Sequence, residues 1–242
     1  MRPLTPINGI SALTKLFSAR KSQKIIPNLL KAVLFDFDGT LAKLNIDFIQ
    51  MRWAVLDLMS DYCAPPDAVR DLYVLEMIEA GKNLISGNNP GRENEFFSRA
   101  HELISHMETE GSKEGELFAG TKDMLYELRS QQIKTGIVTR NCMAAVKQLF
   151  PDIDSCCDVV ITREFTTRVK PHPDHLLTAL VALDTDAGFA AMVGDHPMDI
   201  AAGKDVGVYT IGVLTGHSEA AALREAGADL IIEKAADIIR FL

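Results

Sequence analysis

Short apolar runs alternate with amphipathic stretches from Lys31 to the end of the chain. The runs have the length of β-strands and show no regular polar face, which is typical of strands buried on both sides. They cover residues 32–35, 135–138, 159–161, 190–193, 208–213 and 230–232. Strands separated by helical stretches predict an α/β fold, with a Rossmann-like parallel sheet core flanked by helices.

The strand pattern stops between Ala42 and about Glu116, where helical spacing replaces it. We predict helices over 46–59, from 66 to about 82, and from 92 to about 110, separated by Pro65-Pro66 and by residues 86–91. A core face is expected on the third helix, made by Phe96, Phe97, Ala100, Leu103, Ile104 and Met107. We therefore expect an α/β core at 31–43 and 117–242, with a small inserted all-helical cap domain at 44–116.

The residues before the first strand are basic, and the first acidic side chain is Asp36. This composition is compatible with an organellar transit peptide. Apolar residues at helical spacing (Ile7, Ile10, Leu13, Leu16 and Phe17) favour instead an amphipathic helix packed on the domain. We predict a helical N-terminal arm over residues 1–30, which Pro27 would close.

Composition and charge restrict the classes of binding partner that the chain can have. Its 242 residues are 47% hydrophobic, enough to bury a core, and its net charge of -8 with a pI near 5.3 argues against nucleic acid or an anionic membrane as partner. No apolar run approaches the ~20 residues of a membrane span. A small-molecule ligand fits better, and a monomer or homodimer is expected.

The cysteines indicate a reducing compartment, so we expect a cytoplasmic protein. Cys63, Cys142, Cys156 and Cys157 form no CxxC pair, and a chain of this size needs no disulfides to fold. The adjacent Cys156 and Cys157 could be redox-active. We interpret them as small, half-buried residues before a strand.

Two carboxylates follow the first predicted strand, in the string Asp36-Phe37-Asp38-Gly39-Thr40-Leu41. Removing a carboxylate from water at a strand end is costly unless a cation or hydrogen-bond donors compensate it. An ordinary turn would account for Asp38 and Gly39 but not for Asp36. The string therefore indicates a functional site.

A second acidic pair, Asp195 and Asp199, follows the predicted strand at 190–193 and begins a helix. The carboxyl ends of parallel strands share one edge, so Asp195 can reach Asp36 despite their distance in sequence. A cluster of carboxylates needs positive charge, and oxygen ligands suit a hard cation such as Mg²⁺. Asp199 could also be only a first-turn residue that the helix dipole favours.

Two further strand-end residues carry groups suited to phosphoryl oxygens. Thr139 closes the run at 135–138, and Lys170 lies in the loop Arg168-Val169-Lys170-Pro171. A hydroxyl and an ammonium can both donate hydrogen bonds to phosphate. Each alone would be ordinary, as a strand-end threonine or a solvated lysine.

Together the four segments resemble the haloacid dehalogenase-like (HAD) superfamily, in the order and rough spacing of its motifs, from Lys31 to the C-terminus. The inserted helices resemble the small cap of the subgroup that contains phosphoglycolate phosphatase and β-phosphoglucomutase. The resemblance implies that Asp36 is the nucleophile and Asp38 the general acid and base. Dehalogenases of this superfamily lack the second aspartate, so Asp38 favours phosphoryl transfer.

The same resemblance implies roles for the other motif residues. Thr139 and Lys170 would be catalytic groups that stabilise the phosphoryl oxygens. The implied magnesium ligands are Asp36, Asp38 through its backbone carbonyl, Asp195 and Asp199. The implied substrate-binding residues are Phe37, Gly39, Thr139, Arg140, Asn141 and Lys170.

We therefore predict a Mg²⁺-dependent phosphatase that hydrolyses a small-molecule phosphate monoester through an aspartyl-phosphate intermediate on Asp36. A phosphomutase of the β-phosphoglucomutase type and a catalytically silent binding module stay open as alternatives. Specificity should reside in the cap, where Lys43, Asn45 and Arg52 are weak candidates for binding a substrate anion. His172 and His175 are interpreted as surface residues.

Overall fold

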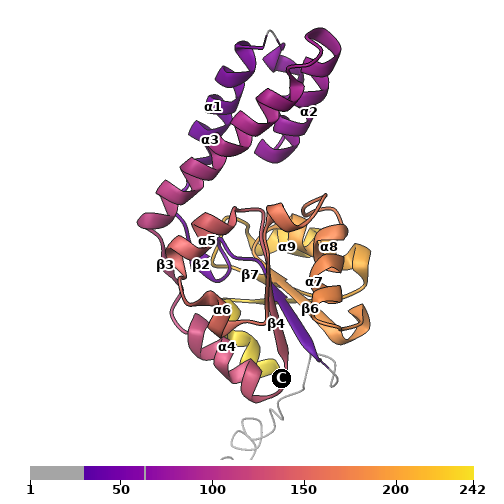
Figure 1. The fold of residues 1–242 in the computed structure, drawn as a ribbon. Helices are drawn as coiled ribbons and strands as arrows, with labels where there is room; N and C mark the ends of the chain where they lie inside the picture. The colour runs from indigo at the N-terminus through magenta and orange to yellow at the C-terminus, as the bar shows by residue number, and fades with distance from the viewer. Residues whose placement is uncertain (1–29, 63) are drawn as a thin grey trace, which may run out of the picture.

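The structure, a computed structural model, describes residues 30–62 and 64–242 (Figure 1). Apart from Leu30, the predicted N-terminal arm lies outside these residues, as does Cys63. A six-stranded parallel sheet forms the centre, in the spatial order β5-β4-β1-β6-β7-β8. Its strands are β1 (Ala32–Phe35), β4 (Lys134–Val138), β5 (Val159–Ile161), β6 (Ala190–Gly194), β7 (Tyr209–Val213) and β8 (Leu230–Ile232). The predicted α/β fold is confirmed.

Alternation along the central strands explains why both faces of the sheet are covered. Val33 and Phe35 of β1 pack into one hydrophobic cluster, whereas Ala32 and Leu34 pack into another. Successive side chains of a strand point to opposite faces, so a continuous apolar run requires a helical layer on each side. Both layers are visible in Figure 1.

Helices on each face complete these two clusters. Residues of α4 (Thr121–Ser130), α5 (Met143–Leu149), α6 (Ile153–Cys156) and η4 (Ala235–Phe241) contribute to the first cluster. Residues of α7 (Asp174–Ala182) and α8 (Pro197–Val206) contribute to the second. No helix in the described part of the chain is long and apolar enough to cross a membrane. The same part of the fold also contains η2 (Arg163–Phe165), η3 (Ala187–Phe189) and α9 (Ala220–Glu225).

Three helices between β1 and β4 pack around a hydrophobic core of their own, at the top of Figure 1. They are α1 (Phe48–Ser60), α2 (Val74–Asn88) and α3 (Glu93–Lys113). A short antiparallel pair, β2 (Ala42–Lys43) with β3 (Glu116–Leu117), lies where the chain leaves the sheet and returns. The helical insertion is confirmed, and the exact division at residues 44 and 116 stays a prediction.

The apolar face predicted on the third helix is present in α3. Phe96, Ala100 and Ile104 are buried, and the other three predicted positions pack against the same core from partly buried sites. Such i, i+4, i+8 spacing places side chains in one stripe along a helix. The stripe faces α1 and α2 and binds the three helices into one unit.

The predicted start of the second helix was wrong. Pro66–Ala68 forms only a 3₁₀ turn (η1), and α2 begins at Val74. The carbonyl of Arg70 accepts a hydrogen bond from the guanidinium of Arg52 on α1, and Tyr73 has an extended backbone. A side-chain donor thus replaces the helical N–H that the carbonyl of Arg70 would need.

Candidate active site

Asp36 and Asp195 leave the sheet where its strand order reverses, between β1 and β6. Val193 pairs with Phe35 in register, and the N–H of Asp36 donates to the carbonyl of Val193 at 2.9 Å. Open α/β sheets bind ligands at this crossing point, outside the carboxyl ends of the strands. Topology alone therefore places the two aspartates side by side.

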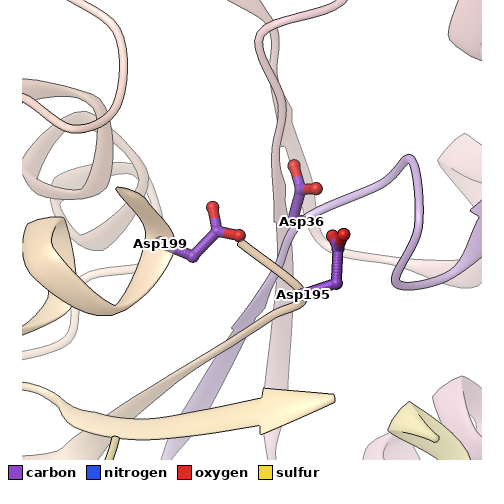
Figure 2. Close-up of side chains that lie close together, drawn as sticks. All are labelled: Asp36, Asp195 and Asp199. Atoms are coloured by element: carbon purple, nitrogen blue, oxygen red, sulfur yellow. The ribbon is translucent and has the colours of Figure 1, made fainter. Parts of the chain in front are cut away.

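Three carboxylates meet at this edge (Figure 2). Asp36, Asp195 and Asp199 each offer an oxygen, and these oxygens all lie within 4.8 Å of one another. Asp195 and Asp199 are buried and Asp36 is half-buried. The convergence predicted for these distant segments is confirmed.

Three glycines leave the space that the carboxylates fill. A Cβ on Gly39 would lie 2.6 Å from Oδ2 of Asp195, and one on Gly216 only 1.8 Å from the same atom. A Cβ on Gly194 would lie 2.3 Å from Oδ2 of Asp199. Gly39 also has a φ of +79°, which other residues rarely adopt. The backbone is shaped closely around the acidic side chains.

Lys170 brings positive charge into the cluster. Its Nζ lies 2.7 Å from Oδ1 of Asp36 and 2.7 Å from Oδ1 of Asp199, and its side chain is 1% exposed. Burial acts to lower the pKa of Lys170, but the two carboxylates raise it above its ordinary value. The ammonium therefore stays charged in the site.

The ammonium of Lys170 does not offset the charge of three carboxylates that lie largely out of water. Burial raises the pKa of Asp36 to about 8 against the effect of Lys170, with Asp199 and Asp195 adding to the rise. Burial and the neighbouring Asp199 raise the pKa of Asp195 to about 6. The cluster must bind protons or a further cation near neutral pH, and its all-oxygen donor set fits a hard divalent ion.

Hydrogen bonds also hold both oxygens of Asp195 and Oδ2 of Asp199. Thr40 Oγ1 donates to Oδ1 of Asp195 at 3.1 Å, and the N–H of His217 donates to Oδ2 at 3.2 Å. Asp199 Oδ2 accepts the N–H of His196 at 3.1 Å in a capping box at the start of α8. Asp199 is thus a helix-capping residue and a member of the acidic cluster at once.

Asp38 lies next to the cluster but does not join it among the described carboxylates. Its Oδ1 accepts the N–H of Leu44 at 2.9 Å, which fixes the side chain against the exit from β1. Burial raises the pKa of Asp38 to about 6, although the hydrogen bond from Leu44 lowers it. A carboxyl with such a pKa can be protonated or ionised near neutral pH, as an acid and base must be.

Thr139 is placed at the same edge by the sheet register. Ile137 pairs with Phe35 at the last position of the register, so Thr139 follows β4 at the edge where Asp36 follows β1. Thr139 is 1% exposed, and its Oγ1 accepts the N–H of Asn141 at 3.2 Å. The hydroxyl proton therefore remains available for an acceptor in the site.

Some predicted substrate-binding residues offer less than the motif implied. The Phe37 side chain is fully buried in the core, so only its backbone can face a ligand. The N–H of Gly39 donates to the carbonyl of Ala42 at 2.7 Å. Asn141 is buried, and the guanidinium of Arg140 pairs with Glu76 of α2.

The weak cap candidates have other contacts. Arg52 binds the carbonyl of Arg70 within the helical insertion, and Asn45 Nδ2 donates to Glu114 at 3.5 Å. Lys43 is exposed on the short strand β2. These contacts give no support to substrate binding by the three residues.

The family follows from comparison with known proteins. Residues 33–213 match the model of the haloacid dehalogenase-like hydrolase family. Pyrophosphatase PpaX of Bacillus cereus is 31% identical over 219 residues, covering 88% of this chain and 96% of its own. A haloacid dehalogenase-like hydrolase domain-containing protein of Arabidopsis thaliana is 31% identical, covering 75% of this chain and 69% of its own.

The chain belongs to the haloacid dehalogenase-like hydrolase family. A crystal structure described as a predicted phosphoglycolate phosphatase from Haemophilus somnus shares this HAD fold, with a TM-score of 0.60. The two sequences are 17% identical, and the match covers 88% of this chain and 97% of the Haemophilus somnus chain. The family resemblance of the sequence motifs is confirmed.

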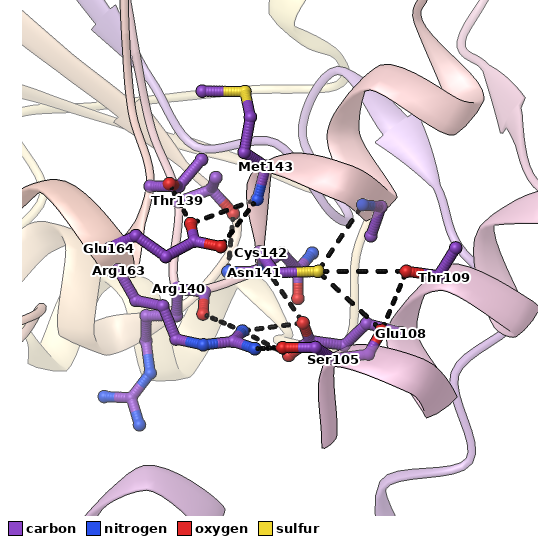
Figure 3. Close-up of polar contacts among 12 residues, drawn as sticks. Ser105, Glu108, Thr109, Thr139, Arg140, Asn141, Cys142, Met143, Arg163 and Glu164 are labelled. Atoms are coloured by element: carbon purple, nitrogen blue, oxygen red, sulfur yellow. Dashed lines mark hydrogen bonds and ion pairs between the residues drawn. The ribbon is translucent and has the colours of Figure 1, made fainter. Parts of the chain in front are cut away.

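A buried ion pair beside the site of this HAD hydrolase could not be predicted from the sequence. Glu108 of α3 and Arg163 of η2 form a buried ion pair at 2.6 Å (Figure 3). Glu108 also accepts the N–H of Cys142 at 3.0 Å, and Arg163 donates to the carbonyl of Arg140 at 3.0 Å. The pair thereby connects α3 to the loop that follows Thr139.

The prediction that His175 is a surface residue was wrong. Its side chain is fully buried, its Nδ1 accepts the N–H of Lys170 at 3.2 Å, and its Nε2 lies 3.2 Å from the carbonyl of Ile161. Burial, with the charge of Lys170, lowers the pKa of His175 to about 3. The ring is neutral, so its Nε2–H donates to Ile161 and links the Lys170 loop to β5.

The half-buried state predicted for Cys156 and Cys157 was also wrong. They lie before β5 as expected, but both are buried. The Sγ of Cys157 contacts the carbonyl of Ile153 at 3.3 Å, and burial raises the pKa of the Cys157 thiol to about 12. A thiol with so high a pKa is a packing group and a poor nucleophile.

Proposed function

We propose that this hydrolase is a Mg²⁺-dependent phosphatase that forms an aspartyl-phosphate on Asp36. The observation that carries the proposal is the contact of Lys170 with Asp36 and Asp199, inside a cluster of three carboxylates at the sheet's crossing point. Asp36, Asp195 and Asp199 would hold Mg²⁺, with the backbone carbonyl of Asp38. When bound, the ion offsets their charge and that of the phosphoryl oxygens.

Each residue then has one task in the reaction. The ionised carboxylate of Asp36 attacks phosphorus, while Lys170 and Thr139 donate to the phosphoryl oxygens. Asp38 gives its proton to the departing alkoxide oxygen as the ester bond breaks. The Asp38 carboxylate next takes a proton from water, which attacks the acyl phosphate, releases inorganic phosphate and restores Asp36.

The substrate is proposed as a small phosphate ester, and inorganic pyrophosphate is a second candidate. The Bacillus cereus relative carries the name pyrophosphatase and matches along nearly all of its length. Both substrates present a terminal phosphoryl group to the same nucleophile. A cytoplasmic location and a monomer or homodimer stay predictions from the sequence.

Phosphate release tests the proposal. Wild-type protein should release phosphate from p-nitrophenyl phosphate only with Mg²⁺. The Asp36→Asn variant should release none, although it should still bind the same ester. Activity retained by Asp36→Asn would defeat the proposal. Conversion of a sugar monophosphate to its isomer would support the phosphomutase, and no turnover of a broad phosphate panel would support the silent module.

A further inference from the structure

A paired carboxylate and guanidinium connect the helical insertion to the candidate active site. Arg140 Nη1 and Nη2 donate to Oε1 and Oε2 of Glu76 at 2.8 and 2.7 Å. Glu76 lies in the first turn of α2, and Arg140 directly follows Thr139. Their side chains are 37% and 17% exposed, so water reaches the pair from one side.

Lys170 connects the guanidinium of Arg140 to the proposed nucleophile Asp36. Its Nη1 also donates to the backbone carbonyl of Lys170, whose Nζ contacts Asp36. The carbonyl of Arg140 is itself held by Arg163. These two hydrogen bonds therefore hold the cationic side chain of Arg140 beside the loop that carries Lys170.

Aromatic rings from both parts of the molecule flank this position. Tyr73, just before α2, lies with its ring 5.7 Å from the guanidinium carbon of Arg140. The same ring meets His196 edge-on at 5.9 Å, and His196 follows Asp195 in the chain. The pair of Arg140 and Glu76 thus lies where the insertion meets the acidic cluster.

The fork of a guanidinium matches two oxygens of a carboxylate or a phosphate equally well. Glu76 presents such oxygens from a side chain whose pKa the hydrogen bonds of Arg140 lower against the effect of burial. A second anionic group on a substrate would offer Arg140 the same contacts. Glu76 therefore occupies Arg140 as a substrate anion would.

We propose that Arg140 binds a second anionic group of the substrate, separate from the phosphoryl group that Asp36 attacks, and that Glu76 occupies this position until the substrate displaces it. The inference rests on the proposed phosphatase function and adds a substrate class to it. The preferred substrates are compact phosphate compounds that carry a carboxylate or a further phosphate.

Two esters that differ in one group test this inference. In 2-phosphoglycolate a carboxylate stands where 2-hydroxyethyl phosphate has a neutral hydroxymethyl group. Arg140→Gln should lower the ratio of kcat/KM for the charged over the neutral ester by roughly tenfold to a hundredfold, the range for a charged hydrogen-bonded contact. Arg140→Lys, which keeps the charge and loses the fork, should give an intermediate ratio.

Glu76→Gln should change the ratio in the opposite direction. An amide competes less well for the guanidinium, so the charged ester should gain severalfold over the neutral one. Arg168→Gln is the matched control, because Arg168 pairs with Asp174 on the surface and should leave the ratio unaltered. Inorganic pyrophosphate in place of phosphoglycolate shows whether a phosphate or a carboxylate gains more from Arg140.

The outcomes separate this inference from the proposed function. Ratios that are equal in wild type, Arg140→Gln and Arg140→Lys would overturn the inference, provided p-nitrophenyl phosphate is still hydrolysed. A ratio that falls as much in Arg168→Gln as in Arg140→Gln would also overturn it. Absence of all hydrolysis by wild-type protein with Mg²⁺ would instead overturn the phosphatase proposal.

Discussion

The Nζ of Lys170 lies 2.7 Å from Oδ1 of Asp36. Because Lys170 also contacts Asp199 in a buried setting, its removal would leave the acidic cluster without this ammonium. Lys170→Met should lower kcat by roughly 10²–10³-fold, as loss of one group that stabilises developing charge does. Steady-state hydrolysis of p-nitrophenyl phosphate measures the effect.

The same variant should also change the stability of the metal-free protein. Breaking a buried ion pair costs about 3 kcal/mol, and protonation of Asp36 would recover part of that cost. Urea unfolding with and without Mg²⁺ measures the free energy of unfolding. Mg²⁺ should reduce the difference in this free energy between Lys170→Met and wild type. A Lys170→Met protein with wild-type kcat would contradict the role given to this lysine.

Mg²⁺ affinity should increase with pH between about 6 and 8. With pKa values of about 8 and about 6, Asp36 and Asp195 retain protons that the ion must displace. Each displaced proton makes the apparent affinity rise by up to roughly tenfold per pH unit. Calorimetric titrations in two buffers of different ionisation enthalpy should show proton release at pH 7, and equal heats would refute this.

These raised pKa values also set the sign of a stability effect. The folded metal-free protein binds more protons than the unfolded chain between the ordinary carboxyl pKa and about 8, so these groups favour folding at the acidic end. Their contribution to the free energy of unfolding falls as pH rises through this window. Saturating Mg²⁺ should weaken or reverse the trend.

Gly39→Ala should weaken Mg²⁺ binding at least roughly tenfold, because its Cβ would overlap the Asp195 carboxylate. Gly207→Ala is a matched control, since Gly207 has a φ of +83° and no atom lies within 4 Å of the place that its Cβ would take. Both variants bear the cost of about 1–2 kcal/mol for an L side chain in the left-handed region. Equal loss of Mg²⁺ affinity in the two variants would show that backbone strain alone is responsible.

His175 is expected to position Lys170 without touching the substrate. His175→Phe removes the acceptor of the Lys170 N–H, and leaving that buried donor unpaired costs about 1–3 kcal/mol. We expect kcat to fall roughly tenfold, and the same substitution to add little in a Lys170→Met background. His172→Phe, on the same loop, is the control, and fully additive losses would argue against coupling.

The sheet could be predicted from the sequence because its signal is local. Runs such as Ala32 to Phe35 are apolar on both faces, and a carboxylate after such a run is conspicuous. The meeting of Asp36 with Asp195 follows from the parallel topology, and the structure bears it out. Thr139 and Lys170 were located by their motifs, although the distances between them cannot be obtained from the sequence.

The remaining contacts depend on tertiary pairing that no local pattern records. Glu76 meets Arg140, and Glu108 meets Arg163, only after the helical insertion packs on the core. His175 was interpreted as a surface residue because it follows Pro173 and Asp174 at a probable helix start, yet its side chain in α7 points inward toward β5. The second predicted helix began too early because a proline starts a turn as readily as a helix.

The central claim is that Asp36 becomes phosphorylated, and trapping the intermediate tests it most directly. Asp38→Ala removes the base that activates water, so acid quenching of this variant with Mg²⁺ and substrate should retain the acyl phosphate. Mass spectrometry of its peptides should find one phosphoryl group, on the peptide and residue of Asp36. A phosphoryl group elsewhere, or none during continued turnover, would contradict the account.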